Sequence, residues 1–224
     1  MTTRNDIESK HVSLTEGQVQ AACHVQAAES LAEAPAAAVI GRLLERVGRM
    51  ARGLQYACGL NPAQWDALRY LAQANRHSRT PSALAAYLGA TKGTTSQTVS
   101  ALEEKGLLRR LSESADRRSV QLELTKEGSA LLASDPLFDL EETIAALDPS
   151  AQSGLVVALE ELLRALAARR SVAQFGVCQR CGHLQGECGS GSAHCGLLGE
   201  ALSPADTGLL CVDFVAGAPA RKPD

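Results

Sequence analysis

The chain is poor in aromatic residues and contains no long hydrophobic run. Phe, Trp and Tyr together make up 3% of its 224 residues, whereas hydrophobic residues make up 45%. Because Leu and Ala recur in nearly every block of ten, we expect a core of aliphatic helices, and a β-sandwich or a disordered chain is disfavoured. No stretch reaches the roughly 18 consecutive apolar residues of a membrane span, and the N-terminus lacks the basic and then apolar pattern of a secretory signal. These absences predict a cytoplasmic protein without membrane contact.

The charged residues are unevenly distributed. The net charge is −3, which by itself argues against a nucleic-acid binder. However, residues 69–118 carry nine basic and four acidic residues, whereas residues 1–34 carry two basic and five acidic ones. The positive field is therefore local and central in the chain.

Composition and hydrophobic spacing divide the chain into four segments. Residues 1–34 have no sustained apolar period and are interpreted as a flexible tail, and residues 218–224 as a disordered C-terminus. Residues 35–173 carry long helical patterns, whereas residues 174–217 are rich in Cys and Gly. The predicted fold is mainly α-helical with one small β-hairpin, followed by a Cys/Gly-rich metal-binding tail.

The centre of the chain predicts a helix-turn-helix followed by a hairpin. Thr80 can cap a first short helix, a turn at 89–91 follows, and a second helix is expected from about Lys92 to the helix-ending Gly106. Two short helices joined by a three-residue turn are typical of this DNA-binding motif. Apolar residues then alternate along 107–124, which predicts a β-hairpin with a polar tip.

The second helix carries small polar residues where a solvated face usually carries Glu and Lys. Val99 and Leu102 are expected to face the core. Because Thr and Ser have poorer helix propensity than Glu and Lys, their presence suggests a contact surface. The expected surface consists of Thr94, Thr95, Ser96, Gln97 and Ser100.

The run from about Asn61 to Leu132 resembles the MarR family of winged-helix transcription regulators. The most specific part is SADRRSVQLELTKEG at 114–128, which resembles the wing of that family and the helix start that follows it. NPAQWDALRYL at 61–71 and LGATKGTTSQTVSALEEKGLLRR at 88–110 support the resemblance. With both flanking helices included, it covers about two-thirds of the chain.

The resemblance implies a homodimer that binds double-stranded DNA at a pseudo-palindromic site. The dimer would form through the first and last helices of the fold, here about 35–57 and 149–168. The recognition helix of such proteins enters the major groove and a wing arginine enters the minor groove. Gln97 could bond adenine, and basic side chains would neutralise phosphates. The predicted DNA-binding residues are Lys92, Thr94, Thr95, Ser96, Gln97, Ser100, Arg109, Arg110, Arg117 and Arg118.

Five of the seven cysteines lie in the last fifth of the chain. In a cytosolic chain such clustering favours metal or redox chemistry over a disulfide framework. The Cys-x2-Cys-Gly turn suits zinc and iron–sulfur centres alike, although a zinc ribbon usually has two such pairs and only one is present here. Cys23 and Cys58 are interpreted as ordinary, Cys58 as a small buried side chain at a helix end. The clustered residues are Cys178, Cys181, Cys188, Cys195 and Cys211.

Four of these cysteines give the pattern C-x2-C-x13-C-x15-C, which resembles the ligand pattern of high-potential iron–sulfur proteins. Phe214 completes the C-x2-F end of related small cluster-binding subunits, whereas His183 stands near the place of their usual aromatic residue. The resemblance implies a [4Fe–4S] cluster, with zinc, or free or disulfide-forming thiols, as alternatives. Cys188 is left as a spare, a substitute ligand or a redox-active thiol. His183 and His194 could replace one thiolate, but they are interpreted as surface residues or as residues behind the ligands. The expected ligands are Cys178, Cys181, Cys195 and Cys211.

Together these patterns predict a dimeric DNA-binding transcription regulator, not an enzyme, whose DNA binding is modulated by a C-terminal iron–sulfur module. A first alternative is a MarR-type regulator that responds to a small organic ligand and has a structural zinc tail. A second is a thiol or electron-transfer enzyme that uses Cys178-x2-Cys181. The sequence offers this enzyme no βαβ surroundings, Gly-rich phosphate loop or nucleophile with an accompanying base.

Overall fold

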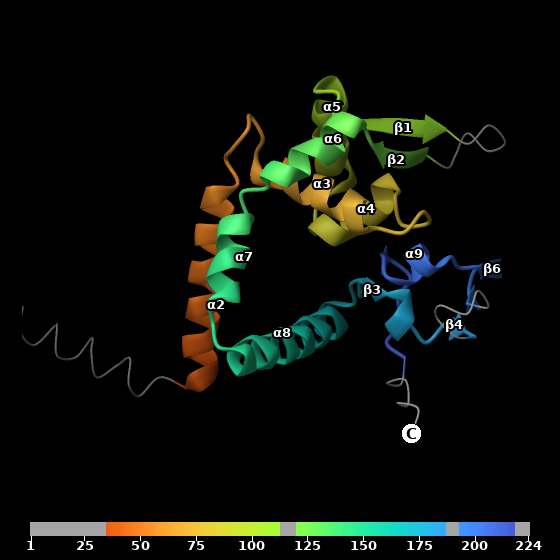
Figure 1. Cartoon of the computed structure of the whole chain (residues 1–224). Coiled ribbons are helices and arrows are strands. Elements are labelled where there is room, and N and C mark those ends of the chain that lie inside the picture. The colour runs from red at the N-terminus through yellow and green to blue at the C-terminus, as the bar shows by residue number, and fades with distance from the viewer. Residues whose placement is uncertain (1–34, 113–119, 187–192, 218–224) are drawn as a thin grey trace, which may run out of the picture. The chain divides into compact units, whose positions relative to one another are not determined.

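The computed structural model describes residues 35–112, 120–186 and 193–217 (Figure 1). The predicted terminal tails, Arg117, Arg118, Cys23 and Cys188 lie outside these described residues. The chain divides into two compact units, residues 1–50 and 51–224. Its larger elements are α2 (Ala36–Leu54), α3 (Pro62–Gln73), α4 (Pro81–Leu88), α5 (Lys92–Glu104), β1 (Leu108–Ser112), β2 (Val120–Leu124), α6 (Lys126–Leu131), α7 (Phe138–Ala145) and α8 (Pro149–Arg170).

Helix α2 is amphipathic, and none of its 19 residues is buried. Its apolar side chains recur at helical spacing, and Ile40, Leu43, Val47 and Met50 are all at least half exposed. The helix ends at Leu54, three residues earlier than the sequence predicts. Among the described helices, none is both long and apolar enough to cross a membrane.

The helices of the winged-helix segment begin where the sequence places their caps. The side chains of Asn61 and Thr80 accept hydrogen bonds from the third backbone N–H of α3 and α4, respectively. Thr91 does the same for α5, and Thr125 for α6. Gly106 follows α5 with a φ of 69°, the left-handed conformation that a glycine adopts without strain at a helix end.

The core of this segment lies between the three helices and the hairpin. Trp65 and Leu68 of α3 are fully buried, as are Leu84 of α4 and Leu102 of α5. Strands β1 and β2 pair antiparallel, with Leu108 opposite Leu124, and close this core. The predicted mainly helical fold with a small hairpin wing is thereby confirmed.

The last long helix, α8, spans Pro149–Arg170 and so extends two residues beyond the dimer helix expected at about 149–168. None of its 22 residues is buried. Its exposed apolar side chains include Leu155, Val156 and Leu163. Both long helices, α2 and α8, therefore carry exposed apolar side chains along their length.

The Cys-rich tail folds into short strands rather than helices. Strand β3 (Gly176–Val177) pairs with β7 (Leu210–Cys211), and β4 (Leu184–Gln185), β5 (His194–Cys195) and β6 (Glu200–Ala201) form a second small sheet. A one-turn helix, α9 (Pro204–Thr207), connects β6 and β7. Although its composition sets the tail apart, it belongs to the same compact unit as the winged helix.

Candidate functional site

The exposed face of α5 is the first candidate site. The helix begins after the turn at 89–91, in which Gly89 has a φ of 60°, and Thr91 caps it. Lys92, Thr94, Ser96 and Gln97 are exposed. Short polar side chains on one face let the helix backbone approach another surface closely, which base-edge contacts require.

One residue of the predicted contact surface is placed differently. Thr95 is 1% exposed and belongs to the buried face of α5. The prediction that Thr95 lies on the contact surface is therefore wrong, because Thr95, Val99 and Leu102 follow one another at helical spacing and share the core face. Among the described residues, the Thr95 hydroxyl has no hydrogen-bond partner. Ser100 is half-buried and accepts a hydrogen bond from Arg110 at 3.1 Å.

The two described arginines of the hairpin are exposed, but they are paired with carboxylates. Nε of Arg109 donates to Oε2 of Glu123 across the hairpin at 2.6 Å. Arg110 lies 3.4 Å from the carboxylate of Glu103 on α5. These two ion pairs reduce the net positive charge beside the exposed face of α5.

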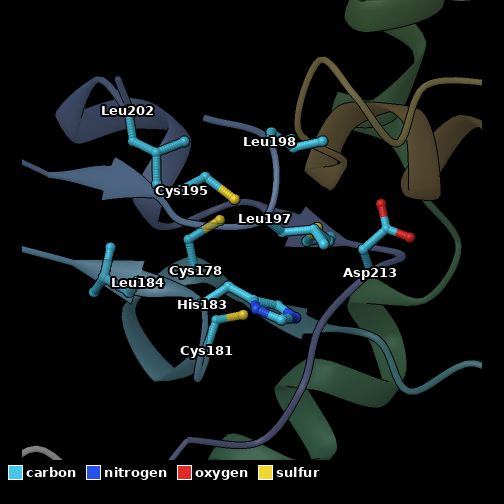
Figure 2. Close-up of a pocket in the computed structure, with 10 residues that line it drawn as sticks. Cys178, Cys181, His183, Leu184, Cys195, Leu197, Leu198, Leu202 and Asp213 are labelled. Carbon is cyan, nitrogen blue, oxygen red and sulfur yellow. The ribbon is translucent and has the colours of Figure 1, made fainter. Parts of the chain in front are cut away.

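The second candidate site is a pocket in the tail at which all four predicted ligands meet (Figure 2). Cys178 and Cys211 are buried, and Cys181 and Cys195 are half-buried; all four are free thiols. They come from separate short segments, because Cys195 ends β5, Cys211 ends β7, and the other two flank a single turn after β3. The remaining lining residues are His183, Leu184, Leu197, Leu198, Leu202 and Asp213.

Cys178 and Cys211 form a hydrogen-bonded pair. The Cys178 thiol donates to the Cys211 sulfur, and this bond lowers the pKa of Cys211 to about 5 against the opposing effect of burial. Further bonds from Asn75, the backbone N–H of Asp213 and Ser78 act in the same direction. The same pairing, followed by burial, raises the pKa of Cys178. The hydrogen bond therefore favours ionisation of Cys211 and protonation of Cys178.

The donors of the pocket are those of a thiolate-bound metal centre. Four thiols line a pocket whose wall includes four leucines, and thiolates are the ligands of iron–sulfur clusters and of zinc. Within the described residues, no three His, Cys, Asp or Glu side chains are grouped so as to hold a metal ion. The metal centre therefore stays a prediction.

The structure also places the other histidines and cysteines that the sequence singled out. His183 lines the pocket, whereas Nδ1 of His194 is buried with no hydrogen-bond partner in the described part of the chain. Cys58, expected to be buried, is exposed because it lies beyond the end of α2 in a left-handed turn with a φ of 52°. Phe214 packs over Gly176, where even a Cβ atom would lie 2.7 Å from the ring.

Two residues of the winged helix lie beside the cysteines, and nothing in the sequence pattern indicates this. Asn75 and Ser78, in the loop between α3 and α4, both hydrogen-bond to the sulfur of Cys211. Their side chains are 3% and 0% exposed. No local pattern marks these two residues, because the contact joins positions more than 130 residues apart.

The first candidate site lies in a segment that matches a known family model. Residues 59–119 match the MarR family model. The match covers about a quarter of the chain, from the end of the loop before α3 to the tip of the hairpin. It confirms the MarR resemblance for the helix-turn-helix and the first half of the wing. The tail, with its four cysteines, lies outside the match.

The chain is also similar to solved MarR structures, although no curated protein matches it. A MarR transcriptional regulator from Methanosarcina mazei Go1 is 22% identical with a TM-score of 0.48, over 56% of this chain and 94% of that one. MepR of S. aureus, solved in complex with DNA, is 22% identical with a TM-score of 0.48, over 60% and 99%. FabT of Streptococcus pneumoniae, also in complex with DNA, is 22% identical with a TM-score of 0.48, over 58% and 94%.

Proposed function

We propose that the protein is a DNA-binding transcription regulator that acts as a dimer. The observation that carries this proposal is the exposed polar face of α5 within the segment that matches the MarR family. Ser96 and Gln97 can approach base edges in a major groove, and the Gln97 amide can bond both N6 and N7 of adenine. Lys92, at the start of the helix, would contact phosphate.

The paired arginines of the hairpin are compatible with this function. Arg109 and Arg110 are bound to exposed or half-exposed carboxylates, and pairs of this kind contribute only about 0–1 kcal/mol each. Phosphate oxygens can replace those carboxylates at little cost, and each replacement releases counterions from the DNA. We therefore expect DNA binding to weaken steeply as the salt concentration rises.

The exposed apolar faces of α2 and α8 provide the dimer surface in this proposal. Long helices without buried residues gain little stability from packing within one chain, so their apolar stripes need a second surface. A second copy supplies identical stripes. Two recognition helices on a two-fold axis would then contact half-sites about 34–36 Å apart on one face of the DNA.

The tail is proposed to hold a [4Fe–4S] cluster through Cys178, Cys181, Cys195 and Cys211, and thereby to modulate DNA binding. When bound, such a cluster supplies one-electron redox chemistry at a potential set by its hydrogen bonds and solvent exposure. The chain provides Leu184, Leu197, Leu198 and Leu202 as a wall that limits water access. Zinc is the competing occupant.

DNA recognition is tested in two steps. The purified full-length protein selects duplexes from a random pool, and the selected duplexes are then footprinted. A pseudo-palindromic footprint with half-sites about one helical turn apart is expected. Gln97→Ala should cost about 1–3 kcal/mol on the selected duplex and almost nothing on random DNA. Gln73→Ala, the same substitution at an exposed position of α3, is the control. An equal loss of affinity for the selected and the random duplex would contradict base recognition by Gln97. A footprint over a single half-site would contradict the dimer.

The occupant of the tail is tested by anaerobic purification followed by iron, sulfide and zinc analysis and a visible absorption spectrum. Iron and sulfide in equal amounts, with a broad visible absorption, are expected. One zinc per chain without iron would replace the cluster with a zinc site and leave the DNA-binding proposal intact.

A further inference from the structure

The tail is attached to the winged helix at the loop between α3 and α4, residues 75–78. The backbone N–H of Asn75 donates to the carbonyl oxygen of Leu210 at 2.8 Å. The backbone N–H of Val212 donates to Oγ of Ser78 at 3.0 Å. Leu210 and Val212 are the two chain neighbours of Cys211, so the loop holds the backbone on both sides of this cysteine.

The first and last residues of this loop, Asn75 and Ser78, are buried and hydrogen-bonded. The backbone N–H of Ser78 donates to Oδ1 of Asn75 at 2.9 Å, and the hydroxyl of Tyr70 in α3 donates to the carbonyl oxygen of Ser78 at 2.6 Å. Buried polar groups cannot exchange such bonds for water, so a displacement of the loop leaves groups unpaired. A shift at Cys211 is therefore passed on through the loop rather than absorbed by solvent.

On its other side the loop continues directly into the DNA-reading elements. The carbonyl oxygen of Arg79 accepts a hydrogen bond from the backbone N–H of Leu122 in β2 at 2.7 Å. The next residue, Thr80, is the N-cap of α4, and its hydroxyl accepts from the backbone N–H of Ala83 at 3.1 Å. Within two residues of Ser78, the chain thus binds the wing strand and begins the helix-turn-helix.

A ring cluster supports the same attachment. Phe175, the residue before β3, makes edge contacts with Tyr87 of α4 and Tyr70 of α3, at centroid distances of 5.2 Å and 6.0 Å. Because β3 pairs with β7, the strand that carries Cys211, both strands of this sheet are fixed to α3 and α4. The tail sheet and the first helix of the motif are therefore held together at two places.

We propose that the loop at 75–78 transmits the state of the cysteine pocket to the helix-turn-helix, because it ties the backbone around Cys211 to the N-terminus of α4 and to β2. This regulatory role rests on the proposed DNA-binding function. Asn75 and Ser78 are positioning residues: they act through Cys211 and the loop and touch no DNA. Removing the Cys211 contacts loosens the loop, the first turn of α4 and the middle of β2.

The coupling is tested without DNA by amide hydrogen exchange of the full-length protein. The N–H groups of Leu84 and Leu122 are the reporters, because they bond to the carbonyls of Thr80 and Arg79. Cys211→Ser should raise their exchange rates about tenfold, the effect of weakening one or two buried bonds. In a Ser78→Ala background, Cys211→Ser should add less than about twofold.

The loop supplies its own control. Arg76→Ala removes an exposed contact with Glu200 and should leave both reporters, and their response to Cys211→Ser, as in the wild type. If Ser78→Ala fails to fold, Asn75→Ala replaces it as the background variant. The backbone hydrogen bonds of residue 75 to Leu210 and Ser78 are retained in Asn75→Ala. Faster exchange confined to residues 193–217 after Cys211→Ser would overturn the proposal.

A measurement of DNA affinity distinguishes this proposal from the DNA-binding function on which it rests. With the duplex selected by the wild-type protein, Cys211→Ser should change the affinity severalfold, and the Ser78→Ala background should abolish that change. Coupled exchange without binding to any duplex would refute the DNA-binding function and retain the coupling. Binding to the duplex with unresponsive reporters would refute the coupling alone.

Discussion

Replacing Thr95 by Val should stabilise the protein without affecting DNA binding. Thr95 is 1% exposed and its hydroxyl has no hydrogen-bond partner, so the folded chain loses the hydration of this group without compensation. An unpaired buried hydroxyl costs about 1–3 kcal/mol. Val has nearly the same shape, is also branched at Cβ, and has a similar helix propensity. We expect a gain of about 1–2 kcal/mol in the free energy of unfolding, or roughly 2–4 °C in Tm for each kcal/mol.

The assay compares two threonines of the same helix. Thr94 is exposed, and its hydroxyl bonds to that of Thr91 at 3.0 Å. Thr94→Val should therefore bring no gain in Tm and should weaken binding to the selected duplex, whereas Thr95→Val should raise Tm at unchanged affinity. Thermal unfolding followed by circular dichroism and fluorescence anisotropy measure the two quantities. A loss of DNA affinity in Thr95→Val would refute the assignment of this residue to the core.

Three further predictions concern the dimer, the metal and the thiol pair. Leu163→Glu on α8 should convert the dimer to a monomer in analytical ultracentrifugation and abolish specific DNA binding, whereas the exposed substitution Glu161→Gln on the same helix should do neither. Cys181→Ser should lower the iron content and bleach the visible absorption, whereas Cys58→Ser, at an exposed thiol outside the pocket, should leave both unchanged. In the metal-free protein, the free energy of unfolding should rise from about pH 5 to about pH 8.5, because in that range the folded Cys211 is a thiolate while the unfolded chain still binds the proton. Above about pH 8.5 the free energy of unfolding should fall again, because the folded Cys178 keeps its proton while the unfolded chain loses it. Urea titrations at several pH values measure this dependence, and Cys211→Ser should make it flatter.

The bounds of the helices could be predicted because the signals that start and end them are local. Asn61 and Thr80 cap helices through bonds to residues only three positions away. A proline in the first turn and Gly106 after the last turn of α5 act over equally short distances. The same holds for the hairpin, whose register follows from the alternation of Leu108 to Leu124.

The misassignment of Thr95 has a different origin. The contact surface was predicted from residue type, because Thr is uncommon on a merely solvated helix face. The spacing of Thr95 to Val99 and Leu102 would have placed it correctly, since a helix repeats every 3.6 residues. Periodicity thus outweighs residue type wherever a helix packs against a core on one side.

The environment of the cysteines was beyond prediction from one sequence. The cysteine spacing correctly selects the four cysteines that line one pocket, but it contains no information about Asn75 and Ser78. The bond between Ser78 and Val212 joins residues 134 positions apart. Such a contact depends on how the tail packs, and neither residue is unusual for a loop before a helix.

The small size of the tail explains why it is built into the winged helix rather than separated from it. Its own core contains four buried residues, Cys178, Ala193, Leu202 and Cys211. Segments of about 40 residues seldom fold alone without a metal, disulfides or association, because they bury too little surface. Two of these four residues are proposed ligands, so loss of the metal would remove a large part of what holds the tail together.

Further support comes from the winged helix, through Phe175 and the loop at 75–78, and from an exposed ion pair between Arg180 and Glu160 of α8. The buried contacts among these are also the ones that fix the start of α4. A change in the pocket that weakens the tail therefore also weakens the hydrogen bonds of Ser78 and its neighbours. Sensing, in this arrangement, needs no separate signalling element, because folding of the sensor and positioning of the DNA-reading helices depend on the same few buried hydrogen bonds.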